Sequence, residues 1–564
     1  MTGGWVPATV PAAAAELIAR GFPPLQARLL AQRGVRTADE AHDFLRPELG
    51  QLSAAGRLRG MAEALERLIR AGRDGEAVAI VGDYDVDGVA ATALLTAALR
   101  AAGARPLPIL AHRHQEGYGF QPLHARRARE LGAAVLITVD CGTNSREAAA
   151  AARADGLDLI VTDHHLPDGG PPIEGVLVNP RQSGCESHAR ELTGAGIAFK
   201  LAAALLEGRG RAVPWDALLR VACLGTIADV APLTGENRVI AALGLRALGE
   251  PRSAGLRALI ESAGLRPPLR AADVAFRLGP RLNAVGRLGS PEPALELLLA
   301  RDPERARDLA ALLERANHER QQLESEVLRD AGEELGAGDG APIGIAWGER
   351  WNRGVVGIAA ARLARRLSRP VVLLAVDGEL ATGSGRSVPG VHLHDFLRPW
   401  AGRLERFGGH EQAVGMTVRR DRLPELAREW RAAARAWPTE SLEPPRVYDL
   451  DLPADAVAAP LLAELEPLEP FGAGNPEPVF RIGALRSVAP ARSFGRGHAA
   501  LRVGLAEGGA PAASFELVAW GWEARVEREL PARFEVLARI ERDRWRGGAR
   551  AVLEELRPLD GSPH

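Results

Sequence analysis

Lysine is almost absent from this sequence, which has Lys200 alone among 564 residues. Its positive charge therefore comes from arginine, so contacts to phosphate fall to guanidinium groups, which can bind two oxygens at once. Cysteine is also scarce, and Cys141, Cys185 and Cys223 form no CxxC pattern. An odd, unpatterned set argues against a disulfide framework and fits the reducing cytoplasm, where we expect the protein.

Long apolar runs are missing too. No stretch reaches the roughly 18 apolar residues of a membrane span, so no membrane association is expected. The N-terminal segment MTGGWVPATVPAAAAELIARG lacks the basic start and long apolar block of a signal peptide. The net charge of -2 does not indicate a nucleic-acid-binding protein. It does not exclude one either, because net charge averages over local patches.

The chain divides into stretches of different pattern. From about residue 76 to 230, short apolar runs alternate with helical Ala/Arg/Leu segments, which predicts βαβ order and a mostly parallel sheet. A charged, leucine-spaced stretch opened by Asp302-Pro303 predicts one long helix of roughly 50 Å that joins two domains. A second α/β pattern begins at IGIAW (343–347), and several strand-like segments after residue 480 predict a small barrel.

The stretch VAIVGDYDVDGVAATALL brings three aspartates, Asp83, Asp85 and Asp87, close together. The start D-x-D-x-D-G matches an EF-hand loop, but the twelfth position, which needs Glu, is Leu94, and a strand precedes the loop. A polar turn without metal is a second interpretation, opposed by the repulsion of like charges. The third is a strand whose carboxyl end delivers carboxylates to a divalent metal.

Three later predicted strands also end on residues that can bind a metal, which favours the third interpretation. LITVDCGT places Asp140 after a buried strand, LIVTDHHLP places Asp163, His164 and His165 after the next strand, and CLGTIADVAPL places Asp229 after an apolar segment. Each of these residues, taken alone, could instead be a helix cap or a solvated surface residue. Together, carboxylates with imidazoles suit Mn²⁺ or Mg²⁺. A cluster this acidic can hold two cations that share a carboxylate, as in phosphoester hydrolysis.

These motifs resemble those of a known family. GDYDVDG, VDCG, TDHH and GTIADVAPL look like motifs I to IV of the DHH phosphoesterases. Seven further segments occur in the order of the RecJ single-strand-specific exonucleases, and the resemblance covers about residues 15 to 555. The seven are EGYGF (116–120), LTGAGIAFKL (192–201), RLGPRLNAVGRLG (277–289), GVVGIAAARL (354–363), GSGRSVPG (383–390), FGGHEQAVGMTV (407–418) and PFGAGNPEPVF (470–480).

The resemblance implies an α/β fold with a parallel-sheet DHH domain, joined by a long helix to a smaller α/β DHHA1 domain, plus a C-terminal OB-fold β-barrel. The expected boundaries are 1–50 for an N-terminal helical region, 51–290 for the DHH catalytic domain, 291–338 for the connecting long helix, 339–440 for the DHHA1 domain and 445–560 for the OB-fold.

The resemblance also assigns the metal ligands. Asp85 and Asp140 would hold one cation, and Asp87, Asp140, His164 and Asp229 the other, with Asp140 as the bridge. Asp83 and His165 would lie beside the metals as catalytic residues, His165 facing the scissile phosphate.

The chain departs from the family pattern at two positions. Cys141 stands where the family usually has Asn, and Asn352 stands where His is usual. Neither is a carried-over ligand. A thiol beside the bridging aspartate can make the site sensitive to oxidation or to soft metals.

Substrate contacts are predicted from basic stretches and from the resemblance. For Arg266 and Arg270 we favour a solvated face, whereas the RLGPRLNAVGR motif favours phosphate contact. In the barrel, Phe494, Trp520, Trp522 and Trp545 lie near arginines, which suits stacking on unpaired bases, although some of them must belong to the core. The predicted substrate-binding residues are Arg113, Tyr118, Arg277, Arg281, Asn283, Arg287, Ser384, Arg386 and His410. Ser384 and Arg386 are expected in a glycine-flanked loop across the cleft from the metals, forming with Arg113 a pocket for a 5′ phosphate.

The resemblance therefore implies a metal-dependent 5′→3′ exonuclease on single-stranded DNA that releases mononucleotides and acts in repair and recombination. Single-strand-binding protein and a RecQ-type helicase are the expected partners, and the protein is expected to be a monomer. One alternative is a DHH phosphodiesterase acting on short oligonucleotides or cyclic dinucleotides, although such relatives lack the N-terminal region and the barrel. Another is a DNA-binding scaffold without activity, which would have lost metal ligands that are present here.

Overall fold

The computed structural model describes residues 4–112, 119–336, 340–437, 445–495, 497–506, 514–543 and 547–559, without the side chains of residues 527–529. The predicted substrate residues Arg113 and Tyr118, and the barrel residue Trp545, lie outside these ranges. In the described part of the chain, no helix is both long and apolar enough to cross a membrane.

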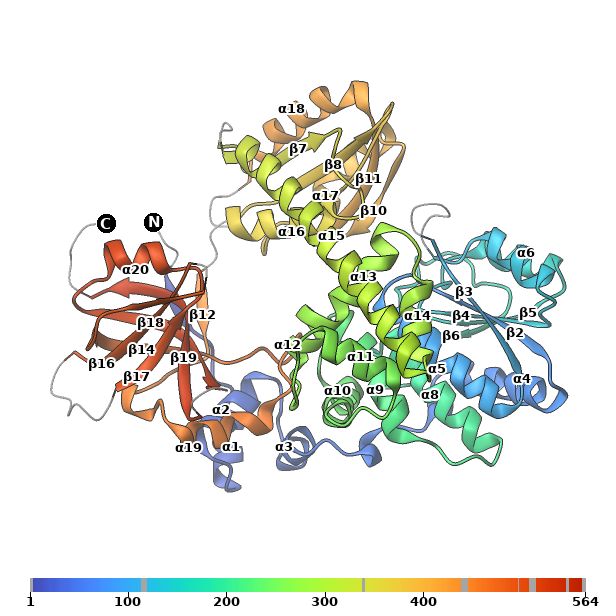
Figure 1. Cartoon of the computed structure of the whole chain (residues 1–564), viewed down its shortest axis with the longest axis horizontal. Coiled ribbons are helices and arrows are strands. Elements are labelled where there is room, and N and C mark those ends of the chain that lie inside the picture. Colours follow the sequence, from blue (N-terminus) through green and yellow to red (C-terminus); the bar gives the residue numbers. More distant parts are fainter. Residues whose placement is uncertain are drawn as a thin grey trace.

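A parallel sheet forms the middle of the DHH domain, with strand order β3-β2-β4-β5-β6 (Figure 1). The strands are β2 (Ala77–Gly82), β3 (Arg105–Leu110), β4 (Val135–Val139), β5 (Asp158–Thr162) and β6 (Val176–Val178). All side chains of β2 are buried, because helices cover both faces of a sheet of this type. The predicted βαβ order is confirmed.

Successive residues of β2 point to opposite faces and join different cores. Val78 and Ile80 pack with α4, α5 and α8, whereas Ala79 and Val81 pack with α6 and α7. These helices are α4 (Met61–Asp74), α5 (Val86–Ala102), α6 (Pro122–Glu130), α7 (Arg146–Ala154) and α8 (Gly194–Gly208). The domain continues with helices α9 (Trp215–Ala228), α10 (Gly235–Leu248), α11 (Ala254–Ser262), α12 (Ala271–Asp273), α13 (Gly279–Leu288) and α14 (Glu292–Leu299).

One helix, α15 (Pro303–Gly336), connects the first two domains, as the sequence predicts (Figure 1). Its first half contributes Leu313 to the core of the DHH domain, and its second half contributes Val327 to a separate core. Between them the buried side chains are polar: Asn317, Arg320 and Glu324. Arg320 donates to Asn317 and Glu324, and Arg362 of the neighbouring helix α16 pairs with Glu324 at 2.8 Å.

The second domain carries a mixed sheet of order β10-β11-β9-β8-β7. β7 and β8 run parallel, and the other neighbours are antiparallel. The elements are β7 (Gly344–Gly348), α16 (Val356–Leu367), β8 (Val371–Asp377), β9 (Leu380–Arg386), α17 (Leu393–Leu397), β10 (Arg406–His410), β11 (Ala413–Arg419) and α18 (Leu423–Ala434). The expected loop around Ser384 and Arg386 is wrong: both residues lie in strand β9, because Gly383 and Gly385 pack closely against Leu374 and Val414 inside the sheet.

The C-terminal sheet closes into a barrel, because β14 pairs with both β18 and β16. Its elements are β13 (Leu450–Asp451), α19 (Ala459–Leu465), β14 (Val479–Ser487), β15 (Arg492–Phe494), β16 (His498–Leu505), β17 (Ser514–Ala519), α20 (Glu523–Glu529), β18 (Phe534–Arg542) and β19 (Ala549–Pro558). The predicted barrel is therefore confirmed. Aromatic side chains gather at its β15–β17 side: the rings of Phe494, His498 and Trp520 lie 4.9 to 5.6 Å apart, and Trp520 is 48% exposed.

The N-terminal segment packs against this barrel. The elements of this segment are β1 (Trp5–Pro7), α1 (Ala13–Ala19), α2 (Pro24–Gln32) and α3 (Ala38–Leu45). Strand β1 pairs in parallel with β12 (Arg446–Tyr448). Leu17, Leu29 and Phe44 share one core with Phe480 and Leu501 of the barrel. Segments more than 400 residues apart in the sequence thus form one unit, visible on the left of Figure 1.

A buried arginine of α10 joins that unit to the DHH domain. Arg238 donates to the carbonyls of Phe44 (2.7 Å), Glu469 (2.9 Å) and Pro467 (3.2 Å), and its guanidinium lies 3.7 Å from the centre of the Phe44 ring. Burial lowers the pKa of Arg238 to about 9, so the group is still charged at neutral pH. The carbonyls and the ring replace the water that this charge has lost.

We predict that Arg238→Met lowers the free energy of unfolding by about 2–4 kcal/mol, because several buried carbonyls lose a charged donor. Denaturant titration and limited proteolysis between the barrel and the DHH domain measure the effect. Arg246→Met is the matched control, since Arg246 lies exposed on the same helix. Equal midpoints for the two variants would contradict this role.

Candidate metal centre

The first ligand loop joins β2 to α5. Asp85 caps α5, and its Oδ1 accepts from the amides of Asp87 (3.0 Å) and Gly88 (3.2 Å). A Cβ on Gly88 would lie 2.5 Å from the carbonyl oxygen of Asp83, so only glycine allows this turn. The loop thus turns all three aspartates around the start of α5, at the carboxyl edge of the sheet.

Asp87 links two helices. It lies in the first turn of α5, and its carboxylate accepts from the amides of Gly194 (2.7 Å) and Ala195 (2.9 Å) at the start of α8. Burial and the charge of Asp85 raise the pKa of Asp87 to about 6, although those amides act to lower it. The start of α8 therefore partly offsets the cost of burying this carboxylate.

Asp140 follows β4 in a left-handed conformation, with φ of 60°, which is costly for a residue other than glycine. A Cβ on Gly194 would lie 2.5 Å from the Cβ of Asp140, so the start of α8 packs directly against it. Burial, followed by the charge of Asp87, raises the pKa of Asp140 well above its usual range. Strain and repulsion are both concentrated at the residue predicted to bridge two cations.

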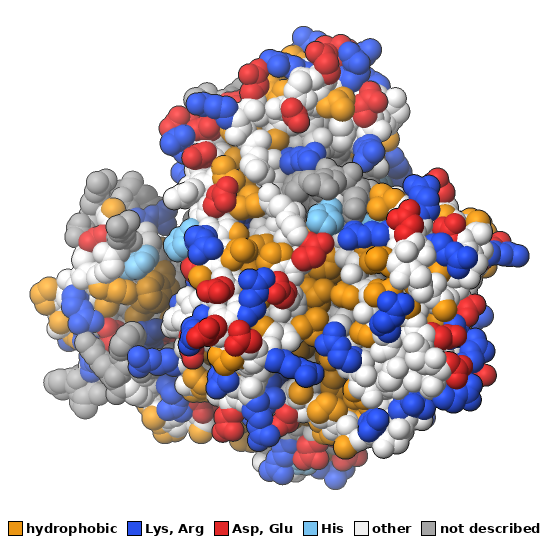
Figure 2. Space-filling model, turned by 45° about the vertical axis from the view of Figure 1, so that its right-hand side comes forward, with side chains coloured by type: hydrophobic (Ala, Val, Ile, Leu, Met, Phe, Trp, Pro, Cys, Tyr) orange, Lys and Arg blue, Asp and Glu red, His pale blue; other side chains and the backbone are white. Residues whose placement is uncertain are grey.

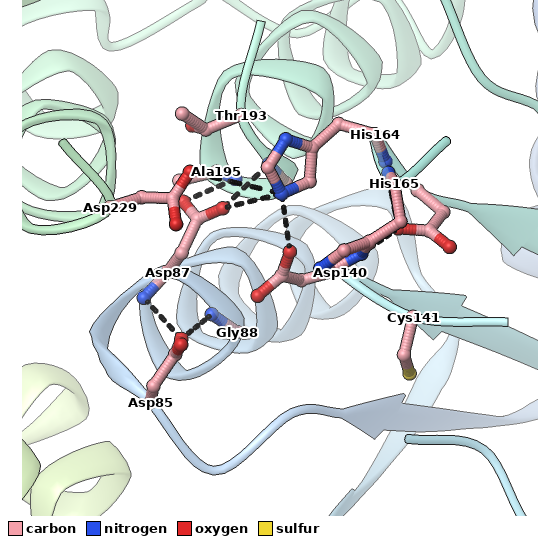
Figure 3. Close-up of polar contacts among 12 residues, drawn as sticks. Asp85, Asp87, Gly88, Asp140, Cys141, His164, His165, Thr193, Ala195 and Asp229 are labelled. Carbon is pink, nitrogen blue, oxygen red and sulfur yellow. Dashed lines mark hydrogen bonds and ion pairs between the residues drawn. The ribbon is translucent and has the colours of Figure 1, made fainter. Parts of the chain in front are cut away.

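His164 completes the cluster. Its Nε2 lies 3.0 Å from Oδ1 of Asp140 and 3.8 Å from carboxylate oxygens of both Asp87 and Asp229 (Figure 3). Burial lowers the pKa of His164 to about 4, so the imidazole is neutral and suited to be a ligand. Two buried atoms that face each other, Asp140 Oδ1 and His164 Nε2, have no hydrogen-bond partner among the described residues.

The ligand atoms fall into overlapping groups that fit cations. Three groups each place their ligand atoms within 4.8 Å of one another: Asp83, Asp85 and Asp140; Asp140, His164 and His165; and Asp87, His164 and Asp229. Asp140 and His164 each belong to two of the groups, so Asp140 is placed where a bridging carboxylate would lie. Oxygen ligands with one imidazole suit Mn²⁺ or Mg²⁺. The geometry adds Asp83 to the first group.

Asp229 is held differently from the prediction. It follows helix α9, as the C-terminal cap, and not a strand, so the expected strand end is wrong at this position. Burial, together with the charges of Asp87 and Asp85, raises the pKa of Asp229 to about 8. The mutual repulsion of these carboxylates is what bound cations would relieve.

Asp163 is a candidate functional residue that the predicted set of site residues omitted. Its Oδ1 lies 2.7 Å from Nδ1 of His165 and accepts from the amides of His164 and His165, while Oδ2 accepts from Thr143. Burial acts to lower the pKa of His165, but the hydrogen bond and charge of Asp163 raise it to about 9. The same contacts keep the pKa of Asp163 below its usual range in spite of burial. The sequence signal that could have indicated this role is the position of Asp163 directly before His164 and His165.

Cys141 does not face the cluster. Figure 3 shows its sulfur turned away from the carboxylates, and Sγ contacts the carbonyl of Val81. Burial raises the pKa of the thiol well above its usual value, so the nucleophilic thiolate is not available. This placement removes the basis for the expected sensitivity to oxidation.

Several predicted substrate residues have internal partners. Arg281 pairs with Glu314 of α15, Arg277 donates to the carbonyl of Ala263, and Asn283 accepts from the amide of Val86 at 3.1 Å. Asn283 thus supports the loop that carries the first three aspartates. Phosphate contact by Arg277, Arg281 and Arg287 stays a prediction.

The predicted residues of the second domain lie together on its sheet. Arg386 donates to Ser384 and to the carbonyl of Gly385, and a Cβ on Gly357, in the first turn of α16, would lie 3.2 Å from Arg386. His410 is exposed at the end of β10. Figure 2 shows this domain as the upper lobe, with basic and acidic side chains interspersed on its visible face.

Comparison with known proteins agrees with this architecture. Three family models match: "DHH family, N-terminal domain" at residues 77–226, "DHHA1 domain" at 340–436 and "RecJ OB domain" at 448–554. The single-stranded-DNA-specific exonuclease RecJ of Dickeya dadantii is 37% identical over 484 residues, which cover 81% of this chain and 83% of that protein. The chain belongs to the RecJ family. RecJ of Bacillus subtilis is 39% identical over 81% of this chain, and the match spans 58% of that RecJ.

The fold is that of a solved RecJ. RecJ of Thermus thermophilus, solved in complex with Mn²⁺, matches with a TM-score of 0.83 at 32% identity, covering 99% of this chain and 80% of that one. The same RecJ in complex with Mg²⁺ matches with a TM-score of 0.77. The predicted family and the three-domain α/β fold are confirmed.

We predict that Asp163→Asn slows phosphodiester hydrolysis by about 10–100-fold, because it orients His165 without belonging to either ligand group. Mn²⁺ affinity, measured by calorimetric titration, should change far less. Asp168→Asn is the control, since Asp168 is exposed in the same loop and pairs with Arg146. A loss of Mn²⁺ binding in proportion to the loss of rate would place Asp163 among the ligands instead.

Proposed function

We propose that this protein is a metal-dependent 5′→3′ exonuclease that acts on single-stranded DNA and releases 5′-mononucleotides. The observation that carries the proposal is the set of ligand groups linked through Asp140 and His164, in a member of the RecJ family. Relatives with this name are single-stranded-DNA-specific exonucleases, and both solved RecJ complexes contain a divalent cation of the kind the ligands suit.

Asp83, Asp85 and Asp140 would hold one cation, and Asp87, Asp140, His164 and Asp229 the other. When bound, the cations activate water and stabilise the charge that develops on the phosphate and on the leaving oxygen. His165 stands beside them, and its hydrogen bond to Asp163 favours the protonated imidazole. It donates to a non-bridging oxygen of the scissile phosphate, and Asp163 fixes the ring in that orientation.

Binding of the strand falls to groups outside the metal centre. The aromatic cluster of Phe494, His498 and Trp520, with Trp520 half exposed, offers a face on which unpaired bases stack, worth roughly 1–3 kcal/mol per base. In the second domain, Ser384, Arg386 and His410 supply polar groups on one sheet.

The proposed role in the cell is repair and recombination in the cytoplasm. A helicase and a single-strand-binding protein are the proposed partners, because the substrate has to be unwound and is coated as it forms. The protein would act as a monomer, since one chain contains all the ligands named above.

The decisive assay uses single-stranded DNA, double-stranded DNA and RNA labelled at either end, with Mn²⁺, and separates products by length. We predict mononucleotides from the 5′ end of single-stranded DNA. Asp140→Asn should abolish this activity, because one carboxylate serves both cations, while DNA affinity without metal stays within a few-fold. Normal turnover by this variant would falsify the two-metal site, and cleavage limited to short oligonucleotides would favour a phosphodiesterase of small substrates.

End recognition gives a second test. We predict that Arg386→Ala erases the preference for 5′-phosphorylated over 5′-hydroxyl DNA and slows cleavage about ten- to a hundred-fold, from the loss of roughly 1.5–3 kcal/mol of charged hydrogen bonds. Rates on matched oligonucleotides measure the ratio. Arg366→Ala, at an exposed position of α16, is the control. If Arg386→Ala keeps the wild-type ratio, the pocket for the 5′ phosphate is formed by other residues.

A further inference from the structure

A groove of about 910 Å³ lies on the DHH domain between α5, α9, α11 and α14. Its floor is apolar and includes Leu94, Ala97, Val221 and Leu299. The ligand Asp87 stands in the first turn of α5, and the groove contacts that helix from Ala93 to Ala101. At ~1.5 Å per residue, the groove begins ~9 Å and ends ~20 Å from Asp87 along the helix.

The second shared helix also separates the two sites. The groove contacts α9 from Trp215 to Val221, and Asp229 caps the other end of that helix, ~12 Å beyond Val221 at ~1.5 Å per residue. None of the metal ligands named above is among the described residues that line the groove. The groove is not part of the site described above.

The border of the groove is strongly basic. Five arginines line it, against one acidic residue, Asp216, which pairs with the buried Arg220. The other four are exposed, and among the described residues no side-chain hydrogen bond or ion pair is found for any of them: Arg100, Arg252, Arg257 and Arg301. Arginines elsewhere in the domain, such as Arg67, Arg146 and Arg281, do pair with carboxylates.

We propose that this groove, defined by the ends of α5 and α14 and the starts of α9 and α11, binds an acidic peptide segment of a partner protein through apolar side chains. The apolar floor accepts aliphatic or aromatic anchors, and the four arginines match carboxylates on either side of them. Nucleic acid fits less well, because Trp215 is the one aromatic side chain among the described lining residues and already packs against Phe199. A strand of DNA would find charge there but no surface for its bases.

The test uses the full chain and a fluorescent synthetic peptide of about twelve residues, in which leucines are spaced among aspartates and glutamates to suit a groove between helices. A second peptide replaces the leucines with serine. Fluorescence anisotropy measures peptide affinity, and a labelled oligodeoxynucleotide without added metal measures DNA affinity on the same samples.

Two variants change the groove at exposed positions. Arg252→Glu with Arg257→Glu reverses charge at the border, and Ala97→Trp fills the floor while leaving the arginines in place. The control, Arg126→Glu with Arg127→Glu, makes the same change of charge on α6, outside the groove. Melting temperatures establish that all three are folded.

We expect the leucine peptide to bind, and both groove variants to weaken it on the order of tenfold while the α6 control does not. The serine peptide should bind less well, and DNA affinity should stay unchanged in the groove variants. The proposal is overturned if the wild type does not bind the peptide, if both groove variants bind it like the wild type, or if the serine peptide binds equally. It is also overturned if the groove variants lose DNA affinity instead, which would make the groove part of the DNA path.

Discussion

The mutual repulsion of five buried or partly buried carboxylates at one sheet edge is the constraint on which this structure depends. Asp83, Asp85 and Asp87 share one loop, and Asp140 and Asp229 come from two further segments. Burial and the charges of the other four raise the pKa of Asp140, and burial with the charges of Asp87 and Asp85 raises that of Asp229. Amides at the starts of α5 and α8 offset part of that cost, and a neutral His164 adds no further charge. Bound cations would offset the rest of this electrostatic cost, so the same arrangement that opposes folding creates the affinity for metal.

Much of this edge could be predicted from the sequence, because each motif followed an apolar run of strand length. The strand ends before Asp83, Asp140 and Asp163 are local features, and the parallel order brings them to one side. Asp229 was misplaced because a buried helix and a buried strand are equally apolar over a short window. Asp163 was not predicted because its proposed role depends on a hydrogen bond to His165. The orientation of a side chain cannot be predicted from the spacing of apolar residues in the sequence.

Long-range packing lay beyond prediction for a different reason. The helices of residues 13–45 are amphipathic, but a pattern says which face is buried, not against what, and their partner is the barrel more than 400 residues away. Arg238 shows the same limit: in sequence it is one arginine among many, and only the fold surrounds it with carbonyls. Ser384 and Arg386 were expected in a loop because glycines flank them. In the structure these glycines instead permit close packing within a sheet.

The polar middle of α15 has a mechanical consequence. Apolar side chains fix each end of this helix in a different core, while Asn317, Arg320 and Glu324 occupy the span between. A helix behaves as a slightly elastic rod, so a bend of ~5° at its centre would move a lobe ~25 Å away by ~2 Å. The ease with which the second domain moves relative to the first is then governed by the stiffness of these few turns. Hydrogen bonds and an ion pair far from the metal ligands would thus limit the relative motion of two domains.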